Sequence, residues 1–122
     1  MPSSGLVISQ IHGVTVATFR EQALLDGPVL DAAASELYAL VDDQARRRVV
    51  VDFTLVRFLS SQAVGVMIQL RQKARAIDGR VVLCGLQPNL SRIFEIMNLQ
   101  KVLEFAPDEE HALNLMGVYT RP

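Results

Sequence analysis

Two adjacent serines, Ser60 and Ser61, carry the side-chain arrangement in this sequence that most clearly suggests chemistry at a defined site. They follow an apolar run that ends at Phe53 and precede a helical pattern that begins at Gln62. A serine at a helix N-terminus can cap the helix, because its hydroxyl oxygen accepts a hydrogen bond from a free N–H group. The same N–H groups and the helix dipole favour a phosphate. The pair therefore predicts a helix cap, a phosphorylation site, or both on neighbouring residues.

The segments on either side of the serines predict how they are held. Val49–Val51 is a continuous apolar run, closed by Asp52 and Phe53, and is typical of a central strand with both faces covered. After the serines, apolar residues recur at helical spacing along an inner stripe: Ala63, Met67, Leu70, Ala74 and Ile77. Gly65 falls on the polar side, where glycine costs about 1 kcal/mol relative to alanine. Close approach of another backbone, within the fold or from a partner, would compensate for this cost. Asp78-Gly79 is expected to end the helix, with the glycine as its C-terminal cap.

The rest of the chain alternates between predicted strands and helices. Leu6–Ile8 and Val14–Phe19 predict an antiparallel β-hairpin, and residues 20–27 a connection. Helical spacing covers residues 30–43 and 90–98, and Pro107 opens a last helix with acidic residues in its first turn. Residues 81–84 and 102–105 are predicted strands, and residues 85–89 a loop. The triplet Arg46–Arg48 is interpreted as cations near a helix C-terminus, with a basic docking patch as the alternative.

This order predicts an α/β fold. We expect one domain over residues 1–122, with a mixed β-sheet opened by an antiparallel hairpin and then alternating strands and about four helices. The helices should cover one face of the sheet, or both faces unequally. The ordered core is expected at about residues 5–117, with loose ends at Met1–Gly5 and Val118–Pro122.

Composition limits the classes of function. The chain has 122 residues, half of them hydrophobic, and a net charge of −1. This balance argues against nucleic acid or an anionic membrane surface as the main partner. No signal-peptide pattern or run of transmembrane length occurs. The one cysteine, Cys84, lies in an apolar run and cannot form an internal disulfide, which fits a reducing compartment. We expect a cytoplasmic protein with no direct membrane insertion.

The sequence shows no pattern of residues typical of an enzyme active site. Ser61 lies outside a Gly-x-Ser-x-Gly elbow. The two histidines, His12 and His111, are interpreted as surface or cap residues. Acidic neighbours such as Asp42-Asp43 diverge on a helix, and no Cys/His cluster has the spacing of a metal site. We therefore predict no catalytic residue, no metal ligand and no cofactor.

The stretch Val56–Met67 resembles the signature of STAS domains, which occur as anti-sigma factor antagonists and as the cytoplasmic tails of sulfate transporters. The pattern is roughly an apolar residue, a variable residue, Phe, an apolar residue, Asp-Ser-Ser-Gly, and then an apolar residue and Gly. Phe58 and Gly65 match the Phe and the later Gly. The hairpin and the order of elements also match, so the resemblance covers almost the whole chain.

Four positions decide what the resemblance implies about the site. Ser61 falls on the residue that kinases phosphorylate in the antagonist branch. Ser60 stands where the family usually has Asp, which removes a charge beside the acceptor. Gln62 replaces the second Ser and Ala63 the first Gly. Ser61 is thus the expected phosphorylation site, and Ser60 the second choice.

The family's mechanism implies the partners. An unphosphorylated antagonist binds an anti-sigma factor with serine kinase activity, phosphorylation by that kinase blocks binding, and a PP2C-type phosphatase restores it. Around Ser61, the expected partner-binding surface is polar and includes these residues: Ser60, Ser61, Gln62, Gly65, Gln69 and Asn89. A weak homodimer stays open as an alternative to a monomer.

Two other functions remain open at this point. One is a constitutive STAS scaffold or subunit, for example of a lipid-transport ABC system or a stress-signalling assembly, which needs the fold but no phosphorylation. The other is a sensor that binds a small molecule or nucleotide in the crevice between strand and helix. The departures at Ser60, Gln62 and Ala63 keep the scaffold open.

Overall fold

The computed structural model describes residues 5–119, so the predictions for Met1–Ser4 and Thr120–Pro122 lie outside it. Its main sheet has five strands in the order β1-β2-β4-β6-β7. These strands are β1 (Leu6–Ile11), β2 (Val14–Phe19), β4 (Arg48–Asp52), β6 (Arg80–Cys84) and β7 (Glu104–Ala106). The β1–β2 pair is antiparallel and the other pairs are parallel. The predicted mixed sheet with an opening hairpin is therefore confirmed.

The hairpin turns through only two residues, His12 and Gly13, with φ angles of 48° and 85°. Two left-handed residues between antiparallel strands match the twist of the strands. Strand β1 runs three residues beyond the predicted Leu6–Ile8, to Ile11. The additional residues include Ser9 and Gln10, which are exposed on this edge strand. Backbone pairing with β2 holds them in the strand although their side chains are polar.

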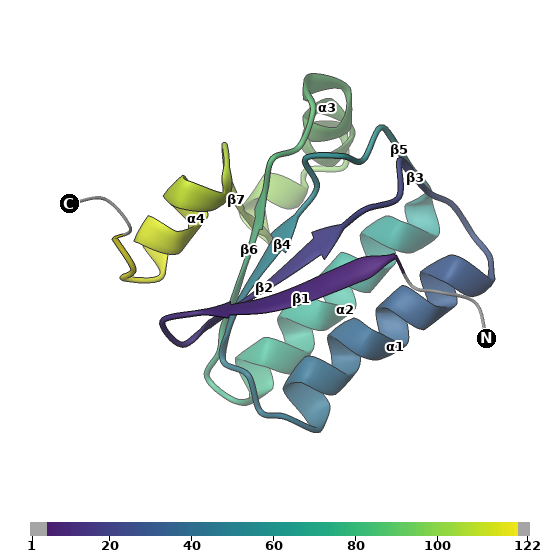
Figure 1. Ribbon diagram of the computed structural model, residues 1–122. Helices are drawn as coiled ribbons and strands as arrows, with labels where there is room; N and C mark the ends of the chain where they lie inside the picture. Colours follow the sequence, from purple (N-terminus) through teal and green to yellow (C-terminus); the bar gives the residue numbers. More distant parts are fainter. Residues whose placement is uncertain (1–4, 120–122) are drawn as a thin grey trace.

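Within residues 5–119, four α-helices and one 3-10 helix surround the sheet: α1 (Pro28–Asp42), α2 (Ser61–Ala76), α3 (Pro88–Ile96), η1 (Leu99–Lys101) and α4 (Glu109–Leu115). Helices α1 and α2 lie side by side on one face, and α4 covers the other (Figure 1). The buried residues accordingly form a large core beneath α1, α2 and α3 and a smaller one beneath α4. The helices thus cover both faces unequally.

Strand β4 is the central strand. Its residues Val49, Val50 and Val51 are fully buried. Val49 and Val51 belong to the large core, whereas Val50 belongs to the small core. Because successive side chains point to opposite faces, the middle of a strand covered on both sides is apolar at successive positions. This explains the uninterrupted valine run at the centre of the sheet.

Helix α2 ends in a different way from the prediction. The left-handed residue after the helix is Asp78, with a φ of 58°, and not Gly79. The N–H of Gly79 donates to the carbonyl of Ala74 at 2.7 Å, and the N–H of Asp78 to that of Arg75 at 3.1 Å, which is the Schellman pattern. Gly79 is required by crowding, since a Cβ there would lie 2.7 Å from the carbonyl oxygen of Arg47.

Two further expectations are corrected. Arg46–Arg48 does not close a helix, because α1 ends at Asp42 and Arg48 is the first residue of β4. Arg48 instead donates a hydrogen bond to the carbonyl of Met116 at 2.8 Å. Val118 is not a loose end: it is buried in the small core, and its N–H donates to the carbonyl of Leu113 at 2.9 Å. Long-range packing, which local sequence does not reveal, decides both cases.

Within residues 5–119, no helix combines the length and apolar character that crossing a lipid bilayer would need.

Candidate functional site

The two serines occupy different positions at the start of α2. Ser60 is the N-cap, and its Oγ accepts a hydrogen bond from the N–H of Ala63 at 3.1 Å. Ser61 is the first helical residue, and its side chain is exposed. The cap is therefore occupied by Ser60, which leaves the Ser61 hydroxyl accessible to solvent beside the free N–H groups of the first turn.

A small parallel sheet, which sequence patterns did not predict, holds the segment before the serines. It pairs β3 (Ala23–Leu24) with β5 (Phe58–Leu59). The N–H of Ser60 also donates to the carbonyl of Leu24 at 2.9 Å. Strands of two residues are too short to show periodicity, so only their pairing defines them. This corner of the molecule, where β3, β5 and the start of α2 meet, is visible in Figure 1.

The predicted polar surface lies on two helices. Gln62, Gly65 and Gln69 are all exposed on α2, at the i, i+3 and i+7 spacing that shares one helix face. Asn89 lies in the first turn of α3 and not in a loop, because α3 begins at Pro88. Its side-chain amide donates to the carbonyl of Arg57 at 3.3 Å. Asn89 therefore connects α3 to the serine segment and is exposed beside it.

Gly65 has open space around it. A Cβ built at this position meets no atom within 4 Å. Close approach of another part of the fold, the first of the two explanations offered for this glycine, is therefore excluded within residues 5–119. A partner backbone remains as the second explanation.

The sequence prediction of the site omitted three exposed apolar side chains near the serines. Leu25, Leu55 and Phe58 are 55%, 51% and 61% exposed. Leu25 follows β3, Phe58 begins β5, and Leu55 lies in the turn before β5. Large apolar side chains that are exposed on segments flanking a polar surface are typical of a protein-binding site. The segments that carry these side chains show neither helical nor strand periodicity. Apolar residues in a segment without periodicity were the only sign in the sequence that these side chains could be exposed.

Other reactive side chains lie away from this corner. His12 is in the β1–β2 turn, and His111 is on α4, where its ring nitrogen lies 2.7 Å from Asp108. Burial and then the charge of Asp52 raise the pKa of the Cys84 thiol to about 12, so the thiol is protonated at neutral pH. Among residues 5–119, no three His, Cys, Asp or Glu side chains gather as metal ligands would.

Comparison with known proteins identifies the family. Residues 6–112 match the family model of the STAS domain. The chain belongs to the STAS domain family. It is 29% identical over 107 residues to BtrV of Bordetella bronchiseptica, named as an anti-sigma factor antagonist, covering 88% of this chain and 90% of BtrV. The name of this relative describes a regulatory role.

Solved structures share the fold. An anti-sigma factor antagonist from Mycobacterium paratuberculosis superimposes with a TM-score of 0.81 at 20% identity, over 93% of each chain. SpoIIAA, a Bacillus cell fate determinant, solved in its phosphorylated form, gives 0.71 at 18% identity, over 91% of this STAS domain and 98% of SpoIIAA. These likenesses confirm the mixed α/β architecture, in which the chain presents Ser60 and Ser61 at the start of α2.

Proposed function

We propose that this STAS domain, residues 1–122, is a cytoplasmic anti-sigma factor antagonist switched by phosphorylation of Ser61. In its unphosphorylated form it binds an anti-sigma factor with serine kinase activity, and a PP2C-type phosphatase reverses the modification. The observation that carries the proposal is the division of roles between the serines: Ser60 caps α2, and the Ser61 hydroxyl is exposed with no hydrogen bond to another described residue.

The position of Ser61 suits a phosphate. A phosphoserine adds roughly −1.5 to −2 charges at neutral pH. At a helix N-terminus this charge meets the positive end of the dipole and free N–H groups, and the first turn of α2 contains no acidic residue that would oppose it. The same charge would be costly at a partner interface that excludes water. Phosphorylation can therefore change binding while the domain stays folded.

The surface around Ser61 supports docking of a protein partner. The polar stripe of Gln62, Gly65 and Gln69 continues from the serines along α2. Leu25 and Phe58 are exposed at the paired strands β3 and β5, of which β5 leads into the serines. An apolar centre with a polar rim is the usual composition of a specific interface. We propose this surface, together with Asn89, as the site for the anti-sigma factor.

Peptide mapping of the protein purified from its own host tests the switch. Trypsin cleaves after Arg57 and Arg71, and the peptide between them contains Ser60 and Ser61 but no other hydroxyl residue. We expect one phosphate, on Ser61, and its loss after treatment with a PP2C-type phosphatase. Phosphate on Ser60, or none under several growth and stress conditions, would overturn the proposal.

Binding measurements with the cognate anti-sigma factor test the surface. Gly65→Arg and Phe58→Ala should each weaken binding about tenfold or more if these positions lie at the centre of the interface. Ser35→Arg, an exposed change of equal charge on α1, serves as the control and should bind like the wild type. Unchanged affinity of folded Gly65→Arg protein would remove Gly65 from the interface.

A constitutive STAS scaffold is the second candidate function. The side chain of Ser60 is already used as a helix cap, and Gln62 and Ala63 depart from the family pattern. If the protein is such a scaffold, both serines serve only to begin α2. Two results together would favour this candidate. A Ser61→Glu variant would bind the partner as tightly as the wild type does, and the protein purified from its host would carry no phosphate.

A further inference from the structure

A basic cleft lies near the far end of α2 from Ser61. It has a volume of about 320 Å³ and is lined by the C-terminal half of α2, the start of β6, and the segment from η1 into β7. Ser61 and Arg75 are 14 positions apart on the helix, which corresponds to about 20 Å at 1.5 Å per residue. The cleft is therefore separate from the surface around the serines.

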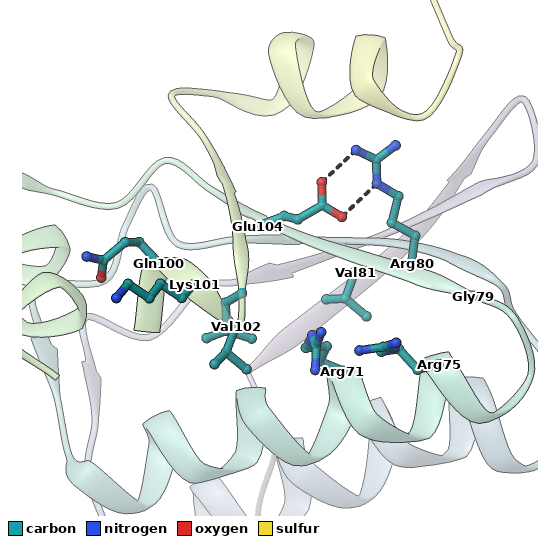
Figure 2. A pocket seen from close by; sticks show the side chains of 10 residues that line it. Arg71, Arg75, Gly79, Arg80, Val81, Gln100, Lys101, Val102 and Glu104 are labelled. Carbon is teal, nitrogen blue, oxygen red and sulfur yellow. Dashed lines mark hydrogen bonds and ion pairs between the residues drawn. The ribbon is translucent and has the colours of Figure 1, made fainter. Parts of the chain in front are cut away.

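One cation at the cleft is already neutralised. The guanidinium of Arg80 donates to the two carboxylate oxygens of Glu104 at 2.7 and 2.6 Å and to the carbonyl of Leu115 at 2.7 Å. The hydrogen bond from Arg80 lowers the pKa of Glu104. In Figure 2 this pair lies on one side of the strands, whereas Arg71 and Arg75 rise from α2 on the other. The only carboxylate in the lining is thus hydrogen-bonded to Arg80, and Arg71 acts on it through its charge alone.

Three other cations at the cleft form no such hydrogen-bonded ion pair. Arg71 and Arg75 are one turn apart on α2, and Lys101 ends η1 on the opposite wall (Figure 2). Within residues 5–119, none of the three makes an ion pair or a side-chain hydrogen bond. Lys73, on the same helix, shows the contrast, since it binds Asp42 at 2.8 Å. A concave surface that gathers like charges attracts a counter-ion.

We propose that this cleft binds a small phosphate compound with two or more negative charges. Each arginine presents a planar fork of donors that matches phosphate oxygens, and Lys101 supplies a point charge opposite. The volume is at the lower end of the range of small-molecule sites, which suits a phosphate or diphosphate group more than a large ligand. This site does not depend on the proposed role of Ser61.

Titration of the isotope-labelled protein with inorganic pyrophosphate, followed by NMR, tests the proposal. We expect saturable shifts of backbone amides in the segments that line the cleft, with an affinity that falls as salt rises. Arg71→Gln/Arg75→Gln should lower the affinity about a hundredfold, because each lost arginine removes at least one charge-assisted hydrogen bond, which corresponds to about tenfold. Arg71→Lys/Arg75→Lys keeps the charge without the fork and should lose less.

A charge-matched control separates a site from general attraction. Arg46→Gln/Arg92→Gln removes the same charge at exposed positions outside the cleft and should leave the affinity unchanged. Equal loss in this control, or shifts spread over the whole surface, would overturn the proposal. Tighter binding of an acidic peptide than of pyrophosphate at the same residues would overturn it in favour of a protein partner. Ser61→Ala should bind pyrophosphate normally, so failure of the switch and failure of this site can be told apart.

Discussion

Alanine substitution should separate the roles of the two serines. Ser60→Ala removes the Oγ that accepts from the N–H of Ala63 at 3.1 Å. Loss of a capping hydrogen bond costs about 1 kcal/mol, within a range of about 0.5–2 kcal/mol. Ser61→Ala removes an exposed hydroxyl with no partner among the described residues and should change stability by less than about 0.5 kcal/mol. The difference between the two variants is therefore about 1 kcal/mol.

Urea unfolding followed by far-UV circular dichroism measures this difference. Ser60→Ala should shift the midpoint without a change in slope, and its Tm should fall by about 3–6 °C for a domain of this size. Ser60→Gly should cost only a few tenths of a kcal/mol. Ser60→Asp keeps a capping oxygen and adds a negative charge at the helix N-terminus, so it should be at least as stable as the wild type.

The outcome bears directly on the switch. If Ser61→Ala destabilises the protein as much as Ser60→Ala, Ser61 takes part in capping and its hydroxyl is not free for a kinase. If neither variant loses stability, the Ser60–Ala63 hydrogen bond contributes nothing measurable. Either result would refute the division of roles on which the proposed function rests.

Gly65 and Gly79 should respond oppositely to alanine in urea unfolding. Gly65→Ala should raise the free energy of unfolding by about 0.5–1 kcal/mol, because its Cβ meets only open space. Gly79→Ala should lower it by about 1–3 kcal/mol, because its Cβ would meet backbone, and changes of equal sign would contradict this explanation. The buried Cys84 thiol should resist Ellman's reagent in the native protein and react in urea; fast native reaction would show that the thiol is accessible. Because Arg80 lowers the pKa of Glu104 from 4.5, their interaction contributes stability above pH 4.5 that is lost as pH falls through the lower folded value. Glu104→Gln should therefore flatten the loss of stability in urea series at acidic pH, and parallel curves for the two proteins would argue against it.

The helix cap at the serine pair could be predicted because the interaction that forms it is close in sequence. Ser60 and Ala63 are three residues apart, so the cap could be predicted from the residue types alone. The burial of the valine run in β4 and of the apolar stripe in α2 could likewise be predicted from the residue types in these segments. The exposed apolar side chains of Leu25 and Phe58 could not be predicted, because they depend on the pairing of β3 with β5.

The basic cleft shows the same limit more clearly. A net charge of −1 gave no sign of a basic surface. Arg71 and Arg75 come from α2, whereas Lys101 comes from η1, beyond the β6 strand and the α3 helix. Only the packing of these elements brings the three cations together. The same packing pairs the Glu104 carboxylate with Arg80, so Glu104 forms no ion pair with the three cations.

The sequence by itself determined the order of elements, the central strand and the serine pair at the start of a helix. Hydrophobic periodicity and capping act over a few residues, so they are readable along the chain. Only the tertiary structure decided which serine is free, why Gly79 is needed, where Val118 is buried and which charges meet in a cleft. These depend on contacts between residues distant in sequence, which the arrangement of the whole chain creates.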